Sequence, residues 1–68
     1  MSENKPLYRV AVTDNATNKE FFSHSTFSVQ DSYLIYQDVK TRYGKENVTL
    51  RLFRNDVEII KRVCPIKE

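Results

Sequence analysis

Few side chains in this sequence could do chemistry, and none has the partners that the chemistry requires. The single histidine, His24, lies between Ser23 and Ser25. Adjacent residues on a strand point to opposite faces, so neither serine can pair with His24 as a nucleophile pairs with its base. A nucleophile also needs an orienting third group and an oxyanion site. We therefore interpret His24 as an ordinary polar strand residue.

The single cysteine, Cys64, excludes an intrachain disulfide. One cysteine and one histidine also cannot build a four-ligand zinc site. Arg62, two residues earlier, would favour a reactive thiolate at Cys64. A lone cysteine before a proline is more often a small apolar filler. The remaining functional interpretation is an oxidative crosslink between two copies.

The single glycine, Gly44, leaves no glycine-rich loop to cradle a phosphate. No two carboxylates have a spacing that demands an acid–base pair. We therefore expect no enzymatic activity, no cofactor and no metal.

Length and charge restrict the chain further. Its 68 residues make one domain at most. A chain of this size hides only about 60% of the surface that its unfolded form exposes, so its stability margin is thin. Without disulfide or metal, self-association is the remaining way to add stability. The net charge of +2 is too small to steer a charged partner by itself.

The domain boundaries follow from composition. We expect a flexible tail over residues 1–5, one domain over 6–65 and a short charged tail over 66–68. The polar opening and the absence of a long apolar run predict neither a signal peptide nor a membrane segment. With a lone thiol, this favours a cytoplasmic protein.

Two strands come first. Tyr8, Val10 and Val12 alternate with polar or small residues, as in a half-buried strand. A turn over 14–18 leads to a second strand from Lys19 to about residue 27. Its facing is ambiguous, because Phe21 and Phe22 are adjacent and one must turn outward or lie at a bulge. We favour Phe21 inward.

A helix follows over about residues 29–43. Ser28 can accept from the Asp31 N–H while the Asp31 carboxylate reaches back to the Ser28 N–H. Gly44 can end the helix in the left-handed conformation. The helical period places an apolar stripe on one face, with Leu34 on the opposite side. The stripe consists of Val29, Tyr33, Tyr36, Val39 and Tyr43, with Ile35 at its edge.

A hairpin closes the domain, with strands at 48–54 and 57–64 and a two-residue loop, Asn55–Asp56. In an unbroken register Leu52 faces Ile59 and Val48 faces Val63. The predicted fold class is α+β: a two-layer ββαββ domain with a four-stranded antiparallel sheet and one helix on one face.

The sheet face opposite the helix is the candidate site. It is expected to carry Arg9, Ala11, Arg51, Phe53, Ile60 and Arg62, with Leu7 and Cys64 near its margins. Three interpretations remain open: a solvated face, a protein interface rich in arginine and aromatic residues, or a nucleic-acid platform. We predict these partner-binding residues: Arg9, Arg51, Phe53, Ile60 and Arg62.

The function predicted from sequence is a small non-enzymatic protein-binding module. Its partner would be another protein or a second copy, reached through the open sheet face or an edge strand, with no membrane involved. The alternative is a small nucleic-acid-binding protein that uses the arginines and Phe53. The small size and Lys/Asn/Tyr-rich composition would fit a phage or mobile-element product that acts on a host protein.

Overall fold

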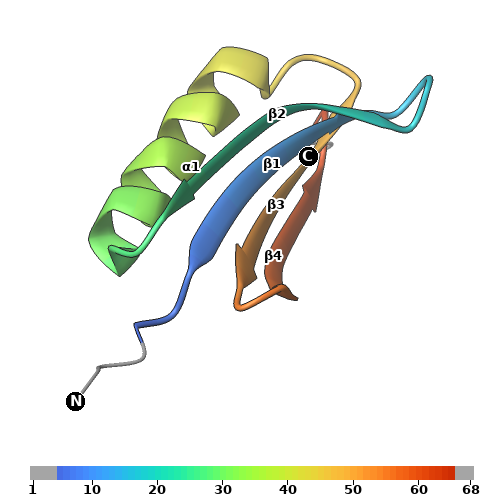
Figure 1. The fold of residues 1–68 in the computed structure, drawn as a ribbon. Coiled ribbons are helices and arrows are strands. Elements are labelled where there is room, and N and C mark those ends of the chain that lie inside the picture. The colour runs from blue at the N-terminus through green and yellow to red at the C-terminus, as the bar shows by residue number, and fades with distance from the viewer. Residues whose placement is uncertain (1–4, 66–68) are drawn as a thin grey trace.

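The computed structural model describes residues 5–65 and contains the predicted ββαββ order (Figure 1). Residues 1–4 of the tail predicted over 1–5, and the tail predicted over 66–68, lie outside the described residues. The elements are β1 (Tyr8–Asp14), β2 (Lys19–Thr26), α1 (Val29–Tyr43), β3 (Val48–Arg54) and β4 (Val57–Val63). Every element that the sequence predicts is present, with ends that differ by one residue or less.

The four strands form one antiparallel sheet in the order β2-β1-β3-β4, an order that the sequence did not reveal. Both β2 and β3 pair antiparallel with β1, so β2 and β3 run parallel to each other on either side of β1. The helix α1 connects these two strands. The helix packs on β1, β2 and β3, and β4 lies farther from it. Figure 1 shows β4 at the edge of the sheet away from α1. The two-layer α+β class is confirmed, but the helix layer covers three strands of the four.

The core lies between α1 and the sheet. The sheet contributes apolar residues to this core from every second position of β1 and β3, as strand alternation requires. Its buried members are Tyr8, Val10, Val12, Tyr36, Val39, Val48, Leu50, Leu52 and Cys64.

The buried stripe of the helix is rotated from the predicted one. Val29 and Tyr33 are exposed over almost half of their surface, and Ser32 is buried instead. Burial of a hydroxyl is tolerated here because the Ser32 Oγ donates to the Val29 carbonyl at 2.7 Å. Tyr36 and Val39 are buried and Tyr43 is half-buried, as predicted.

Both helix ends differ in detail from the prediction. The Ser28 Oγ accepts from the Asp31 N–H at 3.2 Å, as expected of an N-cap. The reciprocal bond predicted from Asp31 is wrong, because the Ser28 N–H donates to the Thr26 Oγ1. Gly44 is not left-handed but lies at φ −62°. A Cβ at Gly44 would clash with the Lys40 carbonyl oxygen, so close approach explains this glycine.

A bulge in β2 settles the facing of its phenylalanines. The register with β1 shifts between Val12 and Thr13, which leaves Phe21 as the extra residue. Phe22 packs against the core, so the preference for Phe21 was wrong. Phe21 is 50% exposed and meets the Tyr43 ring edge-on at 5.5 Å between centroids.

A second bulge shifts the β3–β4 hairpin. The turn is the predicted one, with positive φ at Asn55 (51°) and Asp56 (69°). Beyond it the register shifts between Leu52 and Phe53, so that Leu52 faces Ile60. The predicted partner Ile59 is the extra residue of the bulge. A shift of one residue turns every later side chain to the other face of the sheet.

Candidate functional site

The open face of the sheet gathers three of the five residues predicted to bind a partner. Register places Arg9 opposite Phe53 and Ala11 opposite Arg51 on the two central strands. The predicted placement of Ile60 and Arg62 on this face is wrong. After the bulge they lie opposite Leu52 and Leu50, on the side of the sheet that carries α1. Ile60 packs against the core there.

Arg9 is held by two neighbours on the open face. Its Nη1 donates to both carboxylate oxygens of Glu20, on β2, at 3.1 and 3.2 Å. Its guanidinium carbon lies 4.4 Å from the centre of the Phe53 ring, on β3. This is cation–π geometry. One face of the Phe53 ring is therefore occupied within the chain.

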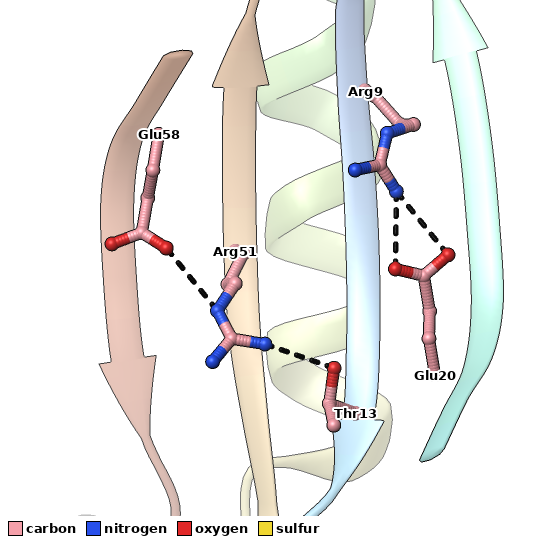
Figure 2. A network of polar contacts seen from close by, with 5 residues as sticks. All are labelled: Arg9, Thr13, Glu20, Arg51 and Glu58. Carbon is pink, nitrogen blue, oxygen red and sulfur yellow. Dashed lines mark hydrogen bonds and ion pairs between the residues drawn. The ribbon is translucent and has the colours of Figure 1, made fainter. Parts of the chain in front are cut away.

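Arg51 makes the matching contacts on the other half of the sheet. Its Nε lies 3.2 Å from the Glu58 Oε1, on β4, and its Nη1 donates to the Thr13 Oγ1 at 3.0 Å. Figure 2 shows both arginines and their partners on one face of the sheet, with α1 behind it. The two sets of contacts together span all four strands.

These side chains shield the face that the helix does not cover. Ala11 lies on the open face and is nevertheless 0% exposed. Thr13 and Thr49, on the same face, are also buried. Glu20 and Glu58 offset the charges of Arg9 and Arg51. The side chains of these ion pairs, with charges of both signs, thus cover the open face.

Three of the four large apolar residues that are exposed on the strands lie instead on β4, the fourth being Phe21 on β2. Val57 is 63% exposed, Ile59 44% and Val63 58%. β4 is an edge strand, and it lies beyond the three strands on which α1 packs. Sequence reasoning missed this surface, because an unbroken register turns all three residues toward the core. The adjacent pair Ile59–Ile60 was the available signal, since adjacent Phe21 and Phe22 had already indicated a bulge.

The remaining chemical candidates are isolated. His24 is exposed on the edge strand β2, opposite Val10. Cys64 is buried in the core, which fits the filler interpretation and keeps the thiol from another copy. Between residues 5 and 65, no three His, Cys, Asp or Glu side chains are grouped so as to hold a metal ion.

A shallow cleft of about 370 Å³ lies at the C-terminal end of α1. Two of its charged side chains serve local structure: the Asp14 Oδ1 accepts from the Ala16 N–H, and Arg42 pairs with Asp38. It is lined by Asp14, Ala16, Phe21, Arg42, Tyr43, Glu46, Asn47 and Val48. This mixture fixes no ligand chemistry.

No helix in the described part of the chain has the length and apolar character needed to cross a membrane. Comparison of the chain with protein-family models, curated proteins and solved structures found no match.

Proposed function

We propose that this chain is a small non-enzymatic protein-binding module, and that β4 is its contact surface. The observation that carries the proposal is the exposure of Val57, Ile59 and Val63 on one uncovered edge strand. Edge strands present unpaired main-chain donors and acceptors that can add a further strand. Exposed apolar residues beside such an edge lose unfavourable contact with water when a partner covers them.

The opposite edge of the sheet supports this choice by contrast. Apart from Phe21 and Phe22, β2 consists of polar residues. They are Lys19, Glu20, Ser23, His24, Ser25 and Thr26. Polar residues along an edge keep it hydrated and discourage pairing. β4 carries four β-branched apolar residues in seven, so it is the edge better suited to a protein partner.

The open face is the weaker candidate, both for protein and for nucleic acid. Nucleic-acid binding by this face would need arginines free for phosphate and an aromatic ring free for stacking. Arg9 and Arg51 are each paired with a glutamate, and Arg9 covers Phe53. The proposal includes a cytoplasmic location, consistent with the lone thiol, and a host protein as target if the gene is of phage origin.

The proposal predicts that Ile59→Lys abolishes partner capture. Tagged wild type and variant would be used to capture proteins from the source cell, with mass spectrometry as the readout. Ile59 is exposed at a bulge, so the variant should fold, and thermal unfolding checks this. We expect recovery of specific partners to fall at least about tenfold, since a charge replaces an apolar contact at the centre of the interface.

Two control variants make the result specific. Thr17→Lys adds the same charge in the exposed β1–β2 turn and should leave capture unchanged. Phe53→Thr removes the aromatic ring from the open face without placing a carboxylate opposite Glu58, and it should also leave capture unchanged. If Phe53→Thr removes the partners and Ile59→Lys does not, the contact surface is the open face and the proposal is wrong.

A further inference from the structure

The free main-chain groups of β4 can be assigned from its pairing with β3. The Cys64 N–H donates to the Val48 carbonyl at 2.7 Å. Alternate residues of an antiparallel strand bond to the same neighbour. The main-chain N–H and C=O groups of Arg62 and Ile60 therefore form hydrogen bonds to β3. Those of Lys61 and Val63 point away from β3, toward the unpaired side of β4, which is the open edge of the sheet.

The bulge adds Glu58 to this set. Val57 lies opposite Arg54 and closes the two-residue turn, so its main chain faces β3. The main-chain groups of Glu58, the next residue, then point to the open edge. Glu58 and Lys61 are thus two residues whose main-chain groups point to this edge, separated by Ile59 and Ile60. Their side chains lie on the open face, as those of their partners Phe53 and Arg51 do.

The charges beside this edge are incompletely balanced within one chain. Lys61 lies directly opposite Arg51, and like charges at such positions repel. The nearby carboxylate, Glu58, is bonded to Arg51. Lys61 has no carboxylate within ion-pair distance among residues 5–65. A carboxylate arriving along the open edge would remove this imbalance.

We infer that the partner on β4 is a second copy of this chain, paired antiparallel about a two-fold axis between Ile59 and Ile60. This inference rests on the proposed function. In this register Glu58 of each copy lies opposite Lys61 of the other. The main-chain groups at the open edges can then form hydrogen bonds between the copies, and a Glu58–Lys61 charge pair forms on each side of the two-fold axis. The two four-stranded sheets then become one continuous sheet.

The same register also covers apolar surface. Val57 and Arg62 both lie on the helix side of the sheet, and each faces the other across the axis. The aliphatic stem of an arginine can pack on a valine while its charged end stays in water. Ile59 and Ile60 of both copies meet at the centre. A two-fold contact needs this kind of self-complementary patch, which β4 supplies in seven residues.

Crosslinking of two variants, each with one added cysteine, tests the register. In the inferred pair the Cα atoms of residues 58 and 61 lie about 5.5 Å apart, within the span of a disulfide. Like positions of the two copies lie about 10 Å apart, beyond that span. Mixing Glu58→Cys with Lys61→Cys under mild oxidation should give a disulfide-linked dimer, whereas each variant alone should not. Wild type controls for the buried Cys64.

A charge exchange measured by sedimentation tests the same pairing without a crosslink. We expect Lys61→Glu to weaken dimerisation about tenfold over about 1 µM to 1 mM, since two cross-strand pairs change sign together. It relieves the repulsion with Arg51, so the monomer should fold. The double variant Glu58→Lys/Lys61→Glu restores both pairs and should recover dimerisation.

Three outcomes would overturn this inference: a monomer throughout that concentration range, no crosslink in the mixture, or equal crosslinking of either variant alone. A monomeric chain that still loses its cellular partners through Ile59→Lys would leave the proposed function standing. Retention of those partners by Ile59→Lys would instead remove the proposed function itself.

Discussion

Leu52→Ala is expected to leave much of the chain unfolded at room temperature. Leu52 is fully buried at the centre of β3, between Val10 on β1 and Ile60 on β4. Truncation of a buried leucine costs about 2–5 kcal/mol, because apolar burial is lost and a cavity remains. Small domains without disulfide or metal rarely gain more than about 3–5 kcal/mol from their core. Urea denaturation followed by circular dichroism measures the loss.

Leu34→Ala provides the matched control. It removes the same atoms from the exposed side of α1, where Leu34 has most of its surface in water. We expect a change within about 0.5 kcal/mol, as for surface positions away from special contacts. Equal destabilisation by the two substitutions would show that the core does not lie between α1 and the sheet as described.

Ala11→Leu is expected to destabilise the fold by about 1–3 kcal/mol, although Ala11 lies on the sheet face that no helix covers. Ala11 is fully buried there, opposite Arg51 on β3 and Ser23 on β2. A larger side chain must displace arginines that now bridge the strands. Their ion pairs are partly exposed, so the loss comes mainly from steric displacement. Thermal and urea unfolding provide the measurement.

Ser23→Leu adds a leucine next to that site without the same obstruction. Ser23 lies beside Ala11 on the same face and is exposed. We expect little change in stability from it. If Ala11→Leu were as well tolerated as Ser23→Leu, the arginines would not form a fixed cover over the sheet.

Local patterns in the sequence were sufficient for the elements of this fold. The period of two in β1, the Ser28 cap and the Asn55–Asp56 turn each depend on neighbouring residues, so they can be read without tertiary structure. Strand order was not readable, because it depends on how α1 connects β2 to β3. The rotated helix stripe was also missed, since a serine with a local hydrogen bond can replace a larger residue in the core.

The two bulges explain most of the errors in the candidate site. Each adds a residue within a strand, at Phe21 and at Ile59, and alternation then continues out of phase. In β4 the shift moved Ile60 and Arg62 away from the open face and left Val63 exposed. Adjacent large apolar residues mark both bulges. Which of the two residues is the extra one depends on the partner strand, which the sequence does not supply.

The composition of the open face was predicted better than its chemistry. Arg9, Arg51 and Phe53 lie there, as alternation requires. The availability of Arg9 to a partner depends on Glu20, which belongs to another strand and is brought beside Arg9 only by the pairing of β1 with β2. Cross-strand contacts of this kind depend on the register of the strands, so the sequence alone did not reveal that ion pairs cover the open face.

Amide hydrogen exchange along β4 tests the central claim most directly. The N–H groups of Glu58, Lys61 and Val63 point to the open edge, so they should exchange rapidly in dilute protein. At high concentration, exchange at Glu58 and Lys61 should slow markedly, because these groups donate to a partner strand once β4 is covered. Amides of the β2 edge should keep their rates. Unchanged exchange in β4, or new protection along β2 instead, would contradict the pairing of two copies through β4.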